Sequence, residues 1–121
     1  PRIFQKENVF AFRTLFWWGN YVSFTLHLKG KYLDSQFINP LLRNQEKDIC
    51  ILSFCGDEWN HDLLSSDYIK LKDLNINSLD CSAIPFLKIC YKMELDQVNK
   101  LKQHYTKYKE ILLAPFYGNK L

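Results

Sequence analysis

The pattern of hydrophobic and polar residues predicts two neighbouring strands near the start of the chain. Residues 9–18 (VFAFRTLFWW) and 21–29 (YVSFTLHLK) are rich in β-branched and aromatic residues, which favour strands. Between them, Gly19-Asn20 is typical of a tight two-residue hairpin loop. That loop length predicts the register of the hairpin, with Trp18 opposite Tyr21.

This register divides the side chains of the hairpin into two faces. The first face is apolar apart from Arg13 and is expected to be core; its cross-strand pairs are Trp17/Val22, Leu15/Phe24, Arg13/Leu26 and Ala11/Leu28. The second face mixes large aromatics with hydroxyls and an imidazole; its pairs are Trp18/Tyr21, Phe16/Ser23, Thr14/Thr25 and Phe12/His27. A mixed face of this kind is either covered by another element or presented to a partner.

Further along the chain, the pattern predicts a short helix and three more strands. Asp34 or Ser35 can cap a helix of one or two turns, which Pro40 limits. The apolar run 48–55 predicts a central strand buried on both faces. Residues 68–74 predict an edge strand with outward lysines, and residues 86–92 predict a final strand. The rest of the stretch from 57 to 85 gives the weakest secondary-structure signals of the chain and is expected to contain loops.

Residues 94–113 predict a long amphipathic helix. Their apolar residues recur at the spacing of one helical stripe, which is expected to pack on the sheet: Leu95, Val98, Leu101, Tyr105, Tyr108 and Leu112. Ala114-Pro115 is expected to end the helix, because the residue before a proline is disfavoured in helical conformation.

Together these elements predict an α+β domain. A four- or five-stranded, mainly antiparallel sheet or curled half-barrel would carry the N-terminal hairpin and the long C-terminal helix. Pleckstrin-homology-like domains have this outline, an analogy of fold that carries no function. A length of 121 residues favours a single domain over 1–121, and the start at Pro1 favours a domain excised from a longer chain. No apolar run is long enough to span a bilayer.

Charge and cysteine content indicate which partners and which cellular compartment to expect. The net charge of +3 arises from residues 92–121, where the lysines that could contact an anion are Lys100, Lys102, Lys107 and Lys109. Of the four cysteines, Cys50, Cys55 and Cys90 lie in apolar runs and are expected to be small buried hydrophobes, while Cys81 lies in a polar stretch. An even number of cysteines could also form two disulfides, but these apolar contexts favour free thiols and therefore an intracellular protein, either cytoplasmic or nuclear.

No motif indicates a catalytic, metal or cofactor site. The spacing of Cys50, Cys55 and His61 does not fit a structural zinc site, and His61-Asp62 lacks the third group that would orient a catalytic base. The acidic residues between 57 and 67 do not match a calcium loop, and four glycines leave no glycine-rich phosphate loop. We therefore expect neither enzymatic activity nor a cofactor.

The leading hypothesis is a non-catalytic protein–protein interaction domain, an adaptor or scaffold. Exposed aromatics supply much of the binding energy at interfaces, so the expected partner contacts are Phe12, Phe16, Trp18, Tyr21 and His27. The alternative is a nucleic-acid-binding domain that combines these aromatics with the lysine-rich helix. Salt dependence separates the two hypotheses, because affinity for nucleic acid falls steeply with ionic strength.

Overall fold

The computed structural model describes residues 2–4 and 7–117. Its six strands form one antiparallel sheet in the order β1-β2-β3-β6-β4-β5. The strands are β1 (Arg2–Phe4), β2 (Val9–Trp17), β3 (Tyr21–Lys29), β4 (Ile51–Ser53), β5 (Ile69–Lys70) and β6 (Leu87–Glu94). The α-helices are α1 (Ser35–Arg43) and α2 (Leu101–Tyr117), and the 3-10 helices are η1 (Gly30–Tyr32), η2 (Leu71–Asp73), η3 (Ile76–Ser78) and η4 (Leu95–Lys100). The α+β class predicted from the sequence is confirmed.

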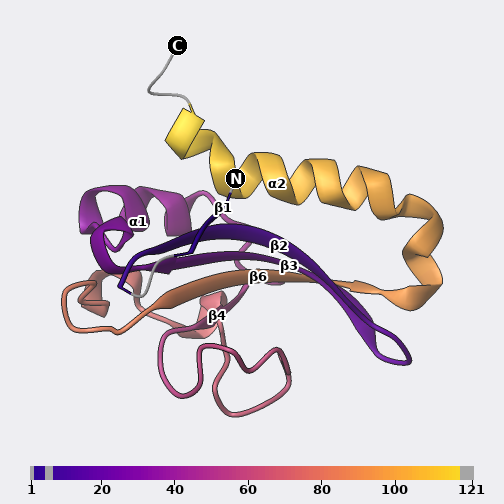
Figure 1. Cartoon of the computed structure of the whole chain (residues 1–121), viewed down its shortest axis with the longest axis horizontal. Coiled ribbons are helices and arrows are strands. Elements are labelled where there is room, and N and C mark those ends of the chain that lie inside the picture. Colours follow the sequence, from indigo (N-terminus) through magenta and orange to yellow (C-terminus); the bar gives the residue numbers. More distant parts are fainter. Residues whose placement is uncertain (1, 5–6, 118–121) are drawn as a thin grey trace.

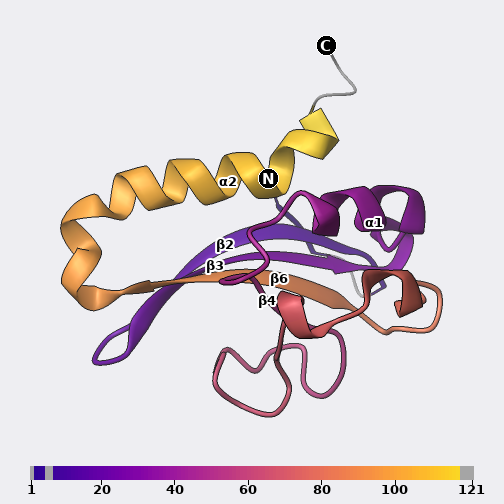
Figure 2. The ribbon, with the colours of Figure 1, turned by 180° about the vertical axis from the view of Figure 1, so that it is seen from behind.

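The sheet has a different cover on each side. Figure 1 and Figure 2 show both α-helices on one face, which we call the helix face, and the long connection from β4 to β6 on the other, the loop face. On the loop face, residues 54–68 are bonded to the sheet through Tyr21, His27 and Lys88. We call residues 54–68 the covering segment.

The main hydrophobic core lies between the sheet and the two helices. Alternate residues of β3 form its floor, because side chains at every second position of a strand share a face. Fully buried contributors are Val22, Phe24, Leu26, Leu28, Ile38, Leu41, Leu42, Ile89, Tyr91 and Leu112. A smaller cluster of Tyr21, Leu63 and Cys90 lies on the loop face.

The predicted register of the hairpin is wrong by one residue. Trp17, not Trp18, pairs with Tyr21, so the loop has three residues, Trp18, Gly19 and Asn20. Gly19 has φ of +87°, and the Asn20 amide donates to the Trp17 carbonyl at 2.9 Å. A slip of one residue exchanges the faces of a strand. The even-numbered residues of β2 therefore join the helix face, whereas Trp17, Leu15, Arg13 and Ala11 join the loop face.

The C-terminal helix is less regular at its start, and longer at its end, than predicted. Residues 95–100 form η4, and α2 then continues through Pro115 to Tyr117. A proline at 115 leaves the Ile111 carbonyl without its helical donor. The Gln45 side-chain amide lies 3.4 Å from that carbonyl and replaces the missing donor.

The predicted stripe of this helix is only partly buried. Tyr108 and Leu112 are buried against the sheet, and Leu95 and Leu101 are half-buried. In contrast, Val98 is 46% exposed and Tyr105 is 38% exposed. The helix is therefore docked mainly through its C-terminal half.

The middle of the chain contains shorter strands and a longer helix than predicted. Asp34 caps α1, its carboxylate accepting from the Gln36 amide at 3.0 Å, and α1 runs three residues past Pro40 to Arg43. The predicted strand 48–55 is reduced to Ile51–Ser53. The predicted strand 68–74 is reduced to Ile69–Lys70, which does form the edge of the sheet.

Candidate interaction surface

Three consecutive aromatic residues are exposed where β2 ends and the hairpin turns. Phe16 and Trp17 are each 38% exposed, and Trp18 is 72% exposed. The rings of Phe16 and Trp18 are stacked with their centroids 5.5 Å apart, and Trp17 meets Tyr21 edge to face. Figure 1 shows this end of the hairpin projecting away from α2. We call Phe16, Trp17 and Trp18 the aromatic tip.

The corrected register separates the five residues predicted to contact a partner, so they do not share one face of the hairpin. Phe12 and Phe16 lie on the helix face, where Phe12 contacts Tyr105 of α2 at 5.8 Å between ring centroids. Trp18 lies in the turn. Tyr21 and His27 belong to the loop face and are buried beneath the covering segment, so they do not form an exposed surface with the others.

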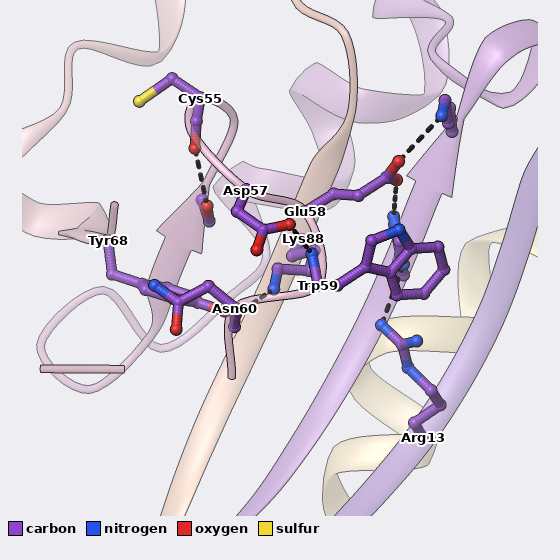
Figure 3. Close-up of polar contacts among 11 residues, drawn as sticks. Arg13, Cys55, Asp57, Glu58, Trp59, Asn60, Tyr68 and Lys88 are labelled. Atoms are coloured by element: carbon purple, nitrogen blue, oxygen red, sulfur yellow. Dashed lines mark hydrogen bonds and ion pairs between the residues drawn. The ribbon is translucent and has the colours of Figure 1, made fainter. Parts of the chain in front are cut away.

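The imidazole of His27, which was expected at an exposed contact surface, is instead part of a buried polar network. His27 Nδ1 lies 2.9 Å from Nη2 of Arg13, and His27 Nε2 lies 2.9 Å from Oε2 of Glu58. This geometry fits a neutral imidazole that accepts from the guanidinium and donates to the carboxylate. Burial and the nearby Arg13 charge lower the pKa of His27 to about 4. Figure 3 shows the arrangement, in which Trp59 lies beside Arg13.

Two further contacts fasten the covering segment to the sheet. Lys88, fully buried on β6, donates from Nζ to the Asn60 carbonyl at 2.7 Å, and burial lowers its pKa (Figure 3). The hydroxyl of Tyr21 donates to the His61 carbonyl and accepts from the Leu63 amide. These bonds fix residues 60–63 over β3 and β6.

Two hollows lie along β2 between the strand and the covering segment. One of about 330 Å³ is lined by Phe12, Arg13, Thr14, Leu15, Ser23, Thr25 and His61. The other, of about 320 Å³, is lined by Leu15, Phe16, Trp17, Asn60, His61 and Asp62. Because both contain Leu15 and His61, they adjoin and form one groove that follows β2 to the aromatic tip.

Among the described residues, the outer edge of β2 is unpaired beyond Ala11, which lies opposite Arg2 near the start of the sequence. β1 pairs only with Val9–Ala11 of β2, and no other described strand pairs with residues 12–17 on that side. The unpaired part of β2, the groove and the aromatic tip therefore lie together at one edge of the sheet.

The lysines proposed as anion contacts are spread over more than one side of α2. Lys102 and Lys109 are seven residues apart and lie on roughly the same side of a helix, since two turns take about seven residues. Lys107 lies about 140° away from Lys102 around the axis, and its Nζ is paired with Glu46 at 3.1 Å. Lys100 precedes α2 in η4. The four lysines form no single basic stripe.

The cysteines are all free, and Cys55 differs from the predicted burial. Cys50 and Cys90 are fully buried, as expected. Cys55 is exposed because the chain has left β4 at Ser53 and turns at Gly56, whereas Cys81 is buried in the helix-face core. Within residues 2–4 and 7–117, no group of three or more His, Cys, Asp or Glu side chains has the geometry to hold a metal ion.

Comparisons with known proteins give no relative for this chain. No protein-family model, no curated protein and no solved structure matches it. In addition, none of the described helices combines the length and apolar character needed to cross a membrane.

Sequence reasoning missed Trp17 and the partnership of Arg13 with His27. Both errors come from the assumed two-residue loop, which placed Trp17 and Arg13 on the core face. With a three-residue loop, the two faces of the hairpin differ more sharply in polarity, because Phe10, Phe12 and Phe16 then share a face with the apolar residues of β3. That sharper division was the signal in the sequence for the correct register.

Proposed function

We propose that this protein is a non-catalytic protein–protein interaction domain, an adaptor or scaffold, whose contact surface is centred on the aromatic tip. The observation that supports the proposal is the exposure of three consecutive aromatics on a projecting hairpin. Residues 14–24 around them contain no charged side chain. Large aromatic side chains are the residues that most often dominate binding energy at protein interfaces.

The polar network favours a structural role over catalysis. Both ring nitrogens of His27 are engaged, by Arg13 and Glu58, so the imidazole is not placed to take a proton from a substrate. Lys88 is fully buried beneath the covering segment and bonded to the Asn60 carbonyl. Both side chains hold a wall of the groove in position.

Binding of single-stranded nucleic acid is the second candidate, and one observation favours it. The stacked rings of Phe16 and Trp18 offer aromatic faces on which bases could stack. The dispersed lysines of α2 weigh against this candidate, since single-strand binders combine stacking platforms with a continuous basic groove. Glu94 lies opposite Tyr21 across the sheet and is paired with Lys92 at 3.2 Å, so this pair adds no net positive charge close to the tip.

The proposal is tested by removing the tip and measuring capture of partners. The Phe16→Ala/Trp18→Ala double variant and the wild type are each used to capture proteins from an extract of the native cells. A partner recognised through the tip should be lost with the double variant, and its purified form should bind the variant at least 30-fold more weakly, equivalent to about 2 kcal/mol. Binding is measured by calorimetry.

Leu64→Ala is the matched control, because Leu64 is 75% exposed but lies outside the tip. It should retain every partner of the wild type. Equal capture by wild type and double variant would contradict the proposal. Tip-dependent binding of a labelled single-stranded oligonucleotide that falls steeply with salt would favour the nucleic-acid alternative.

The setting of this function is also a proposal. The four free cysteines suit a reducing compartment, so we place the interaction in the cytoplasm or the nucleus. The pleckstrin-homology-like outline expected from the order of elements is not needed for the proposal, which rests on the aromatic tip.

A further inference from the structure

We propose that a hollow beside the β5 edge of the sheet, the edge away from β1, binds a small phosphate ester. The hollow has a volume of about 340 Å³. Its polar lining consists of three cationic side chains and two amides: Arg43, Lys47, Lys72, Asn75 and Asn77. We call it the basic hollow. Among the described residues, no acidic side chain lines it. This inference goes beyond the proposed function, because the basic hollow shares no residue with the aromatic tip.

The turns that follow β5 bring these side chains to the end of α1. Leu71 begins η2 directly after β5; its side chain is buried in the helix-face core, and its amide donates to the Cys50 carbonyl at 2.9 Å. Asn75 caps η3, its Oδ1 accepting from the Asn77 amide at 3.1 Å. Arg43, the last residue of α1, donates from Nη2 to Oδ1 of Asn77 at 2.8 Å. These bonds hold η3 against the end of α1.

The polar side chains of the basic hollow offer mainly hydrogen-bond donors. Arginine and lysine side chains only donate, so the side-chain acceptors are the two amide oxygens. Each of these oxygens already accepts a hydrogen bond, in Asn75 from the Asn77 backbone and in Asn77 from Arg43. Both donors require an oxygen, which fixes the orientation of the two amides. Within the described residues neither NH2 group donates a hydrogen bond, so a ligand that supplies acceptors fits this lining.

The positive charge of the basic hollow is not neutralised by neighbouring carboxylates. Arg43 is bonded to a neutral amide. In the described part of the chain, none of the three cations lies within ion-pair distance of a carboxylate, although Asp48 and Asp73 directly follow the two lysines in the sequence. A basic residue in the last turn of α1 is favourable for the helix itself, but Lys47 and Lys72 lie outside α1. Three such charges around one hollow favour an anionic ligand.

The number and kind of these donors indicate a phosphate group rather than a carboxylate. A phosphate monoester carries a charge of about −1.5 to −2 at pH 7 and has three acceptor oxygens, whereas a carboxylate has a single charge and two oxygens. Five donor side chains from α1, the turn after it and the segment η2–η3 suit the phosphate. The volume is at the lower end of the range for small-molecule sites. Leu74 and Ile76 add an apolar part to the lining, on which the organic part of the ester would pack.

Phenyl phosphate is the probe, because it joins a phosphate ester to a compact apolar group. Its affinity is measured by calorimetry, and the NMR signals of side-chain NH2 groups locate it on the protein. Binding should be saturable, with a Kd of about 1 mM or lower, and should shift the signals of Asn75 and Asn77 but not that of Gln103 on α2. Benzoate, which carries a carboxylate on the same ring, should bind at least about 10-fold more weakly. The proposal is overturned by equal affinity for benzoate, or by the absence of saturable shifts at Asn75 and Asn77 up to about 10 mM phenyl phosphate.

The Lys47→Gln/Lys72→Gln double variant removes two of the three positive charges. Both lysines are exposed, so the variant should unfold at the same temperature as wild type. It should bind phenyl phosphate at least about 10-fold more weakly, because two charge-assisted hydrogen bonds are lost. Lys100→Gln/Lys102→Gln is the matched control: it removes the same charge from another exposed part of the surface and should bind like wild type. Equal losses in the two double variants would reveal a general effect of net charge and overturn the proposal.

The outcomes separate this inference from the proposed function. The Phe16→Ala/Trp18→Ala variant should bind phenyl phosphate like wild type, because the aromatic tip is not part of the basic hollow. If partners depend on the tip but wild type does not bind phenyl phosphate at the basic hollow, the proposed function stands and this inference is wrong. A phosphoserine peptide or a single-stranded oligonucleotide that shifts the same NH2 signals where phenyl phosphate does not would mean that the phosphate belongs to a macromolecule, and it would overturn the small ligand.

Discussion

At the scale of single residues, one buried amide explains how a helix continues through a proline. Gln45 is 5% exposed, and its Nε2 lies within hydrogen-bond distance of the carbonyls of Leu41 and Ile111, while its Oε1 accepts from the Tyr91 hydroxyl. These bonds link α1, α2 and β6. The proline rule applied to the sequence is correct for an isolated helix. It fails here because the compensating donor comes from a residue 70 positions before the proline.

Residue-scale burial also predicts how the thiols react. Cys55 is exposed, whereas Cys50, Cys81 and Cys90 are buried, and burial raises the pKa of Cys50 to about 12 and of Cys90 to about 11. Thiolate is the reactive form, so one thiol per chain should react rapidly with Ellman's reagent in the folded protein, and all four after unfolding.

The Cys55→Ser variant identifies the fast thiol in this experiment. It should abolish the rapid phase and leave the slow phase unchanged. Two or more rapidly reacting thiols in the wild type would show that a cysteine placed in the core is accessible.

At the scale of elements, the strands were easier to predict than their pairing. Strand β3 has its predicted bounds because its composition and the flanking Gly30 are local signals. The register with β2 depends on whether the loop has two or three residues, and Gly19-Asn20 is compatible with both. That single ambiguity moved Trp17 and Arg13 to the wrong face. It also led to the prediction that Tyr21 and His27 contact a partner, although the covering segment buries both.

The covering segment itself could not be predicted from its sequence. Its residues show neither helical nor strand periodicity, and it is held by individual long-range bonds such as Lys88 to the Asn60 carbonyl. Nothing local in the sequence indicates that Glu58 will meet His27, which lies 31 positions earlier. The groove beside β2 was therefore absent from the sequence analysis, although the tip aromatics Phe16 and Trp18 were identified.

The uneven docking of α2 gives a prediction for this element. Leu112 is fully buried in the helix-face core, so Leu112→Ala should lower the free energy of unfolding by about 2–5 kcal/mol. Val98 belongs to the same predicted stripe but is 46% exposed, and Val98→Ala should change it by less than about 0.5 kcal/mol. Urea unfolding followed by tryptophan fluorescence measures both values. Equal losses would mean that the helix is docked along its whole length.

At the scale of the whole molecule, the two faces of the sheet are stabilised by different forces. The helix face is held by burial of apolar side chains, which depends little on pH. The loop face is held by polar and charged contacts, including the bonds of Glu58 to His27 and to Lys29, each 2.9 Å long. Burial alone would raise the pKa of Glu58, but its bonds to Lys29 and His27 hold it below the ordinary value. Lowering the pH should therefore weaken the contacts of the loop face before it affects the helix-face core.

This difference predicts how the stability of the whole protein depends on pH. His27 has a pKa of about 4 in the folded protein and about 6.5 in the unfolded chain, so the unfolded state binds the proton first as pH falls. Its contribution is complete above pH 6.5 and is lost between pH 6.5 and 4. The slope from this group is at most about 1.4 kcal/mol per pH unit, so the total loss is roughly 3 kcal/mol. Urea unfolding at a series of pH values measures it.

The His27→Gln variant isolates this effect, because glutamine cannot take up the proton. It should be less stable than wild type at pH 7.5, since bonds to Arg13 and Glu58 are altered, but it should lose less stability on acidification. The two curves therefore converge toward pH 4. Lys29→Met is the matched control: it removes the Lys29–Glu58 ion pair but keeps the imidazole, and should retain most of the wild-type slope. Parallel curves for wild type and His27→Gln would show that His27 is not buried as a neutral imidazole. They would then also contradict the bond between His27 and Glu58 that holds the covering segment to the sheet.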